Sequence, residues 1–253
     1  MSQITRPLAG RRILVTGGAT GIGAAAVEVL TAAGATVAAT LHNSEPASPS
    51  AATWLRCDVT DAGAVDRLVG DVVGQLGGLD VLVHAAGLWH PGIPGSIGTD
   101  DIRMVLDTNF TSTVLTNQAA YGAMRDTGGQ IINFGSSEAV LGSPISAIYA
   151  AAKAAVAAWT RSSAKAWAAQ RVTVNALAPA VDTPGADRLR TFLGPDAAPF
   201  LEKALETTIP LGGKLGDPAR DLGPILVFLA GDGARFITGQ LLAVDGGLMM
   251  LGA

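Results

Sequence analysis

Residues 11–34 read RRILVTGGATGIGAAAVEVLTAAG, and this stretch decides the fold that we predict for the chain. The apolar run that ends at Thr16 is short and is typical of a buried strand. A glycine-rich turn follows at Gly17–Gly23, and the alanine-rich run Ala24–Ala33 then favours a helix that Gly34 closes. Strand, glycine-rich turn and helix in this order form the context in which such a turn binds phosphate.

The turn has a physical reason to bind a dinucleotide. Glycines let the backbone approach a pyrophosphate closely, and the free amides of a helix N-terminus favour negative charge. An ordinary tight turn is the alternative, since the chain contains 32 glycines. The strand before the turn and the helix after it favour the nucleotide interpretation.

The rest of the chain alternates strand patterns with helix patterns. Strands are expected at residues 11–16, 35–41, 53–57, 79–84, 130–135, 171–177 and 241–245. Helices are expected near residues 21–33, 62–76, 99–124, 147–169 and 217–230. Such units build an α/β fold, here a single-domain, doubly wound, Rossmann-like parallel sheet of about seven strands over residues 1–253. Ligands bind at the carboxyl ends of the strands in this fold.

Composition narrows the functional classes. The formal charge of −4, without a basic run, argues against a nucleic-acid surface. Cys57 is the only cysteine, so no internal disulfide can form and a reducing compartment is expected. Neither a secretory leader pattern nor an apolar run of roughly 18 residues is present. We therefore expect a soluble, cytoplasmic protein with a small-molecule substrate, no nucleic-acid or membrane partner and no metal site.

Tyr149 and Lys153 carry the strongest chemical signal. They lie four residues apart in an alanine-rich helix pattern, so their side chains share one face. A phenol loses its proton near pH 10, and a nearby ammonium lowers that pKa toward neutral pH. Ser136, upstream, offers a hydroxyl to the same substrate oxygen. Such a pair also occurs on solvated helix faces, but its combination with the glycine turn favours acid–base chemistry on a carbonyl.

Taken together, these motifs resemble the short-chain dehydrogenase/reductase family over nearly the full length of the chain. The matching segments are Thr16–Gly23, Asp58 with Val59, Asn109, Ser136, Tyr149 with Lys153, and residues 237–240 and 244–247. The resemblance implies an oxidoreductase that transfers a hydride between a nicotinamide cofactor and a carbonyl or secondary alcohol. Several motifs in the right order make the match specific.

The resemblance also implies a role for each site residue. Ser136 and Tyr149 would bind the carbonyl oxygen, and Tyr149 would deliver the proton. Lys153 would lower the pKa of the phenol and hold the ribose, while Asn109 would support a water that leads protons to solvent. The expected catalytic residues are Asn109, Ser136, Tyr149 and Lys153. The expected cofactor-binding residues are Gly17, Thr20, Gly21, Ile22, Gly23, Leu41, His42, Asp58, Val59, Ala85, Ala86, Gly87, Tyr149, Lys153, Pro179, Val181 and Thr183.

Two segments depart from the family pattern. The usual Asn-Asn-Ala-Gly is replaced by the four residues from His84 to Gly87, which predicts a weakened structural hydrogen bond rather than altered chemistry. His84 is expected to be a strand-end residue without a catalytic role. After the sixth strand, Pro179 is followed by alanine instead of glycine, and the segment to Thr183 is one residue short. By position, Val181 and Thr183 remain the expected contacts of the nicotinamide.

Cofactor choice depends on the end of the second strand. An acidic residue there would bind the ribose diol of NAD and repel the 2′-phosphate of NADP. Leu41 occupies this place and His42 follows, so nothing repels NADP. Thr20 and His42 offer no permanent cation to a phosphate either. The sequence slightly favours NADP, and NAD remains open.

The segment 183–216 is predicted to be a substrate lid, from its place in the family. It carries apolar side chains among prolines and glycines, which favours a hydrophobic ketone or alcohol over a phosphorylated sugar. These side chains could instead pack the lid onto the body. Trp89, after Gly87, is expected at the pocket rim.

The helical stretches 110–124 and 150–169 contain few charged residues. Since each can cover only one sheet face, the remaining apolar surface predicts subunit contacts, and the resemblance implies a homotetramer built as a dimer of dimers. Tight alanine packing in a monomer is the alternative.

Two other functions remain open. A catalytically idle nucleotide-binding sensor or regulator of the same fold would not need the complete set of four catalytic residues. An enoyl reductase would reduce a C=C bond, but those enzymes usually space tyrosine and lysine more widely than four.

Overall fold

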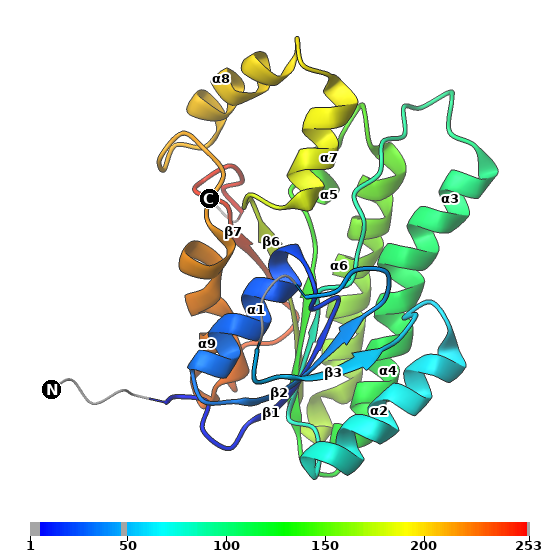
Figure 1. Ribbon diagram of the computed structural model, residues 1–253, viewed down its shortest axis with the longest axis vertical. Helices are drawn as coiled ribbons and strands as arrows, with labels where there is room; N and C mark the ends of the chain where they lie inside the picture. The colour runs from blue at the N-terminus through cyan, green and yellow to red at the C-terminus, as the bar shows by residue number, and fades with distance from the viewer. Residues whose placement is uncertain (1–5, 47–49, 252–253) are drawn as a thin grey trace, which may run out of the picture.

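The structure, a computed structural model, describes residues 6–46 and 50–251 of the chain. Its centre is a seven-stranded sheet in the order β3-β2-β1-β4-β5-β6-β7, and every adjacent pair of strands is parallel (Figure 1). The strands are β1 (Arg12–Thr16), β2 (Thr36–Leu41), β3 (Thr53–Arg56), β4 (Val81–His84), β5 (Gly129–Phe134), β6 (Val172–Pro179) and β7 (Leu241–Val244). The predicted doubly wound sheet is confirmed.

Helices cover both faces of this sheet (Figure 1). They are α1 (Gly21–Ala32), α2 (Ala62–Leu76), α3 (Thr99–Leu106), α4 (Ser112–Met124), α5 (Glu138–Leu141), α6 (Ala147–Trp167), α7 (Pro184–Leu193), α8 (Ala198–Thr208) and α9 (Gly223–Ala230). Helices α1 and α9 contact one another on one face, and α2, α4 and α6 pack together on the other. The sheet is therefore buried from two sides, which explains why its strands read as apolar runs rather than as alternating patterns.

Strand β1 shows how the sequence divides between the two cores. Ile13 and Val15 belong to the apolar cluster that includes Leu30 of α1 and Leu226 of α9. Leu14, between them, belongs to the cluster on the other face with residues of α2 and α4. Successive side chains of a strand point to opposite faces, so one short apolar run contributes to both cores. The glycine turn follows at the carboxyl end of β1.

The helices differ from the expectation in three places. The helix expected at 99–124 contains a π-helical turn at Asp107–Thr111, and the one expected at 217–230 opens with another at Pro218–Leu222. The helix expected at 147–169 ends at Trp167 and is followed by a 3₁₀ turn at Ala168–Gln170. Apolar periodicity does not reveal π-turns, because the extra residue shifts the pattern by only one position. The segment 183–216, predicted to be a substrate lid, contains two helices, α7 and α8, that were not predicted.

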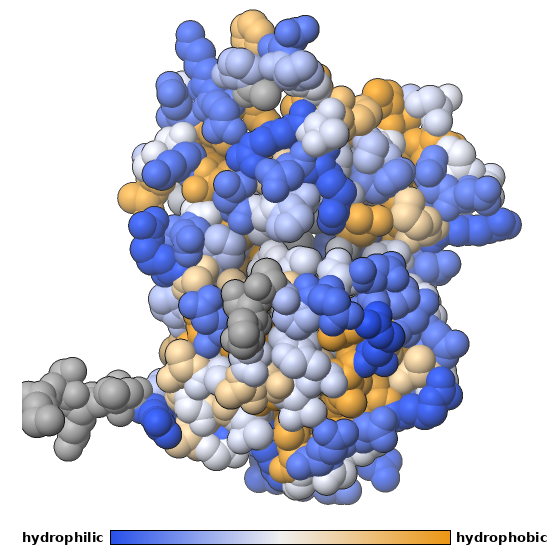
Figure 2. Space-filling model, in the orientation of Figure 1, coloured by the Kyte–Doolittle hydropathy of each residue, from blue (hydrophilic) through white to orange (hydrophobic). Residues whose placement is uncertain are grey.

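Among the described residues, no helix is both long and apolar enough to cross a membrane. The face of the molecule in Figure 2 is a mixture of hydrophilic residues and smaller apolar patches.

Candidate active site

A cleft of about 360 Å³ lies at the carboxyl ends of the strands, between the sheet and α7. It brings together most of the residues predicted for catalysis and cofactor binding. Those that line it are Gly17, Thr20, Gly21, Ile22, Ala85, Ala86, Gly87, Asn109, Ser136, Tyr149, Lys153, Pro179, Val181 and Thr183. Segments that are far apart in the sequence thus meet in one site, as the parallel topology requires.

The other predicted residues do not line this cleft. Gly23 lies beneath the turn, where a Cβ atom would come within 2.0 Å of the Gly17 carbonyl oxygen. Leu41 and His42 lie at the end of β2, next to Asp58 and Val59 at the end of β3, because the Cys57 amide donates to the Leu41 carbonyl at 3.0 Å. These four residues therefore form a separate edge, which fits the adenosine end of a dinucleotide better than its reacting end.

The glycine turn has the geometry that a pyrophosphate needs. Gly17 has a φ of +64°, and a Cβ atom there would lie 2.8 Å from the Ala86 Cα. The amides of Gly17 and Gly18 donate to the Thr40 Oγ1 and carbonyl oxygen at 3.0 and 2.8 Å, which fixes the turn against β2. At the start of α1, Thr20 makes no capping side-chain bond and the first turn holds no acidic residue. The helix amides are thus left for an anion, so the turn fits the phosphates of a nicotinamide cofactor.

The edge formed by β2 and β3 carries charges of both signs. Arg56 donates to the His42 carbonyl oxygen and pairs with Glu45 at 2.6 Å. Hydrogen bonds from the hydroxyl and amide of Thr60 lower the pKa of the Asp58 carboxyl, and the nearby His42 lowers it further. Asp58 is therefore ionised at neutral pH and is an acceptor at this edge.

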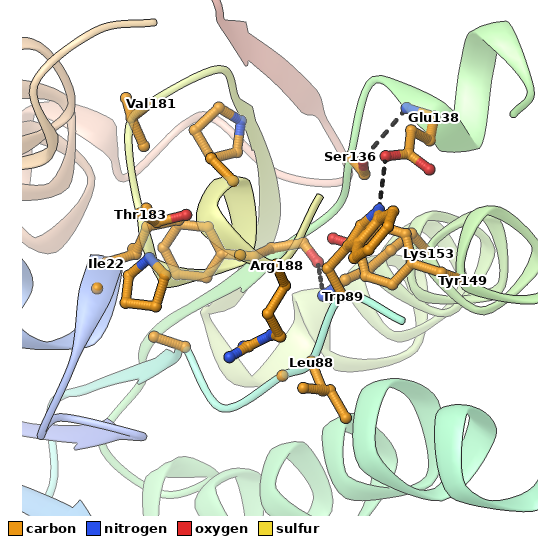
Figure 3. A pocket seen from close by; sticks show the side chains of 18 of the residues that line it. Ile22, Leu88, Trp89, Ser136, Glu138, Tyr149, Lys153, Val181, Thr183 and Arg188 are labelled. Atoms are coloured by element: carbon orange, nitrogen blue, oxygen red, sulfur yellow. Dashed lines mark hydrogen bonds between the residues drawn. The ribbon is translucent and has the colours of Figure 1, made fainter. Parts of the chain in front are cut away.

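Tyr149 and Lys153 lie on the first turns of α6, on the side that faces the cleft, as their spacing predicted. Lys153 is 6% exposed, and its Nζ donates to the Phe134 carbonyl oxygen at 3.0 Å. The same nitrogen lies 5.8 Å from the centre of the Tyr149 ring. Ser136 follows β5, and its Oγ accepts from the Glu138 amide at 3.2 Å. One helix and one strand end therefore place the phenol, ammonium and hydroxyl together (Figure 3).

Burial and three neighbouring side chains act on the pKa of the phenol. Burial raises the pKa of Tyr149, the carboxylate of Glu138 raises it further, and the Ser136 hydroxyl and the Arg188 guanidinium lower it. Burial also lowers the pKa of Lys153, to about 8. The Lys153 ammonium donates to the Phe134 carbonyl oxygen in this structure, and its effect on the pKa of the phenol stays a prediction.

Asn109 lies in the π-helical turn between α3 and α4 and is completely buried. Its Nδ2 donates to the carbonyl oxygens of Leu88 and Val105, both at 3.0 Å, and its Oδ1 accepts from the Leu88 amide at 3.0 Å. A Cβ atom at Gly87 would come within 3.1 Å of Asn109 Oδ1 and 3.4 Å of Lys153 Nζ. Asn109 thus holds the loop after β4 close to Lys153, through a turn type that often occurs at functional sites.

His84, at the end of β4, is buried in a network of hydroxyl groups. Its Nδ1 lies 2.9 Å from both Thr16 Oγ1 and Thr116 Oγ1, and its Nε2 lies 3.3 Å from Ser112 Oγ. Thr16 Oγ1 also accepts from the Ala86 amide at 3.2 Å. The prediction of a weakened structural hydrogen bond at this position is wrong, because the imidazole joins β1, β4 and α4. Burial lowers its pKa to about 3, so it is a neutral structural residue.

Two charged residues that line the cleft, Glu138 and Arg188, were not predicted from the sequence. Glu138 accepts from the Trp89 indole at 3.1 Å and also from the Ser146 hydroxyl, and so fixes Trp89 in the cleft wall (Figure 3). Trp89 is 8% exposed and contacts Phe192 of α7 edge to face at 6.2 Å. Trp89 was expected at the rim, and it is instead part of the wall. The only sequence signal for Glu138 is its place two residues after Ser136.

Within the described ranges, no group of three or more histidine, cysteine or acidic side chains could hold a metal ion.

A doubly wound sheet with a phosphate-binding turn and a buried tyrosine–lysine pair defines a dinucleotide-dependent oxidoreductase. A family model described as "Enoyl-(Acyl carrier protein) reductase" matches residues 17–249. The 2,5-dichloro-2,5-cyclohexadiene-1,4-diol dehydrogenase of Sphingobium indicum is 37% identical over 250 residues, covering 95% of this chain and 97% of the relative. The cis-4-hydroxycyclohexanecarboxylate dehydrogenase of Sinomonas cyclohexanicum is 36% identical, with coverages of 94% and 96%.

Among solved structures, the ligand-free aldohexose dehydrogenase of Thermoplasma acidophilum superposes with a TM-score of 0.87. It is 27% identical, and the alignment covers 97% of this chain and 96% of that one. The chain belongs to the short-chain dehydrogenase/reductase family. It is an oxidoreductase that transfers a hydride between a nicotinamide cofactor and a carbonyl or alcohol group.

Proposed function

We propose that this enzyme reduces a hydrophobic, ring-bearing ketone, or oxidises the matching secondary alcohol, with Asn109, Ser136, Tyr149 and Lys153 as its catalytic set. The observation that carries the proposal is the meeting of the phenol, the ammonium and the serine hydroxyl in one cleft beside the glycine turn. The nicotinamide, when bound, supplies or accepts the hydride.

In this proposal, each group of cleft residues has a distinct role. The amides of the turn from Gly17 to Gly23 hold the pyrophosphate, and Ala85–Gly87 line the ribose. Pro179, Val181 and Thr183, which also line the cleft, would hold the nicotinamide. Ser136 and Tyr149 hydrogen-bond the carbonyl oxygen, and the phenol gives its proton to that oxygen during reduction.

Lys153 and Asn109 serve the phenol and the cofactor. Lys153 would hold the ribose hydroxyls, and its ammonium, close to the phenol, would favour the ionised form of Tyr149. Asn109 keeps the loop at Gly87 close to Lys153. A water beside Asn109 would carry protons between Lys153 and solvent.

The walls of the cleft support an apolar ring as the substrate. Leu88, Trp89, Leu189 and Leu248 line it together with the catalytic residues. The Sphingobium and Sinomonas relatives are named for substrates with a six-membered carbocycle that bears hydroxyl groups. We therefore propose an alicyclic or aromatic ketone, or the matching alcohol, as the substrate class.

NADP is the preferred cofactor in this proposal, and NAD is the alternative. Leu41 leaves no carboxylate at the position that would repel a 2′-phosphate. The guanidinium of Arg56 lies at the same edge, although it is paired with Glu45. Asp58 and Val59 would receive the adenine, and Leu41 and His42 its ribose.

We further propose that the protein is a cytoplasmic homotetramer. Each subunit would be a single domain with a substrate lid. Exposed alanines at 151, 154 and 158 of α6, with the fully exposed Phe236 and the 72% exposed Met250, support subunit contacts. Residues 183–216 would act as the lid, because α7 lies against the cleft and contacts Trp89 through Phe192.

The test compares wild type with Tyr149→Phe on a panel of ketones. NADPH and NADH oxidation would be followed with cyclohexanone, aryl ketones, diketones, 4-oxocyclohexanecarboxylate and its methyl ester. We expect turnover by the wild type and a loss of roughly 10²–10⁴ in kcat for the variant, because the general acid is missing. Cofactor affinity should stay within a few fold. Cofactor binding without any turnover by the wild type would contradict the substrate class and favour the nucleotide-binding sensor.

A further inference from the structure

Arg188 extends from α7 into the cleft and faces the space between the glycine turn and Leu88 (Figure 3). It lies on the lid helix, one turn past Thr183 and Pro184 at the helix start. Lys153 is the other basic residue of the cleft lining, and it is buried and bonded to the Phe134 carbonyl. Arg188 is therefore the cation of the cleft that a ligand can reach.

The guanidinium of Arg188 has no partner within the part of the chain that the structure describes. Arg190, two residues later on the same helix, pairs with Asp182, Asp187 and Glu202. No hydrogen bond or ion pair among the described residues involves Arg188, although acidic side chains surround its helix. A structural arginine would be expected to share these carboxylates, so the orientation of Arg188 into the cleft indicates a ligand.

The acidic residue of the cleft lining forms no ion pair with Arg188 among the described residues. Both carboxylate oxygens of Glu138 are engaged, one by the Trp89 indole and the other by the Ser146 hydroxyl. Arg188 lies near enough to the phenol to lower the pKa of Tyr149, so its charge acts inside the cleft. Within the described part of the chain, the cleft thus combines apolar walls with a planar cation that pairs with no carboxylate, a combination that suits an apolar molecule with an anionic end.

We propose that Arg188 is a ligand-binding residue that binds an anionic oxygen group, a carboxylate or a phosphate, in this cleft. The group has two possible sources, since the cleft runs from the pyrophosphate turn to Tyr149: the cofactor phosphates or a carboxylate on the substrate. This inference deepens the proposed function, and the substrate source rests on it. In either case Arg188 couples the lid helix to the bound ligand, because it lies on α7.

The experiment measures binding, so that it does not depend on turnover. The variants are Arg188→Gln, Arg188→Lys and the control Arg103→Gln, which removes an equal charge from the exposed end of α3, where Arg103 lies 3.7 Å from Asp100. One titration follows NADPH and NADH fluorescence. The other follows cyclohexanecarboxylate and its methyl ester by calorimetry on the NADPH-saturated enzyme. These two probes have no ring carbonyl, so they bind without being reduced.

We expect Arg188→Gln to weaken one anionic ligand by about tenfold, which is the lower end for a charge-assisted hydrogen bond at an exposed site. If Arg188→Gln loses affinity for the acid but not for the ester, Arg188 binds a carboxylate on the substrate. If the variant loses affinity for both nucleotides but not for the acid, Arg188 binds the cofactor phosphates. Arg188→Lys should recover part of the loss, since it restores the charge without the planar fork.

Two results would overturn the proposal. The first is unchanged affinity of Arg188→Gln for the acid and for both nucleotides. The second is an equal loss in Arg103→Gln, which would show a general effect of net charge. Failure of the ketone panel, with the binding differences intact, would reject only the proposed substrate class.

Discussion

The buried imidazole of His84 makes a quantitative prediction about acid stability. The side chain is 2% exposed and stays neutral in the fold, because burial and the nearby Lys153 lower its pKa to about 3. In the unfolded chain the same group has its ordinary pKa of 6.5. Below pH 6.5 the unfolded state therefore binds a proton that the folded state does not, and stability falls as the pH is lowered toward 3.

The size of this effect follows from the two pKa values. Each pH unit in this window costs about 1.4 kcal/mol, so between pH 7 and pH 4.5 His84 alone should remove about 2.5 kcal/mol from the free energy of unfolding. A folded-state pKa one unit higher would change this figure little, because pH 4.5 would still lie above it. Asparagine, the usual family residue, does not titrate, so His84→Asn should lose this part of the pH dependence.

The assay is urea unfolding of wild type and His84→Asn, followed by circular dichroism at half-unit steps from pH 7.5 to pH 4.5. All other titrating groups are common to both proteins, so the difference between the two curves isolates His84. We expect the wild type to lose about 2.5 kcal/mol more than the variant over this range. Parallel curves, with a constant offset, would refute the reasoning and show that His84 has the same pKa in the folded and unfolded states.

Three further predictions concern the cofactor and the phenol. Gly23→Ala should abolish NADPH binding in a fluorescence titration, because its Cβ would lie 2.0 Å from the Gly17 carbonyl oxygen and force the turn apart; binding within a few fold of wild type would contradict this. Glu138→Gln removes a charge that raises the pKa of Tyr149 and keeps an acceptor for Trp89, so the alkaline limb of the kcat/KM profile for ketone reduction should move to lower pH. An unmoved limb would mean that Glu138 does not influence the phenol. His42→Arg should tighten NADPH by about tenfold in equilibrium titrations and leave NADH unchanged, since arginine binds a 2′-phosphate. Equal gains for both nucleotides would indicate another cause.

The strands were predictable because both faces of the sheet are buried. Apolar runs such as the one before Thr16 are short and end at glycine or polar residues, so their bounds agree with the structure to within two residues. The glycine turn and the Tyr149–Lys153 pair were found because their chemistry depends on local spacing, which a sequence shows directly. The family comparison then agrees with the reaction class that these motifs predicted.

Contacts between distant segments were not predictable in the same way. Nothing near residue 84 in the sequence indicates that Thr116 and Ser112 would receive an imidazole. Arg188 and Arg190 look alike in the sequence, and only the folded helix shows that Arg190 pairs with carboxylates while Arg188 has no partner among the described residues. The helices α7 and α8 were missed because they are short and proline or glycine lies at the start of each, which favoured a loop.

The hydrogen bond between Thr16 and His84 joins two residues that are 68 positions apart, in the central strands of the sheet. Strand β1 is made before its two partners, and one of them, β4, leaves the ribosome only after α1, two more strands and α2. Parallel pairing over such a separation costs loop-closure entropy before any contact forms, and it slows folding. We therefore expect the nascent chain to expose an unpaired apolar edge of β1 for several seconds, at about 5–20 residues added per second. That interval would make the growing chain a client for chaperones, although the finished fold has its central strands covered on both sides.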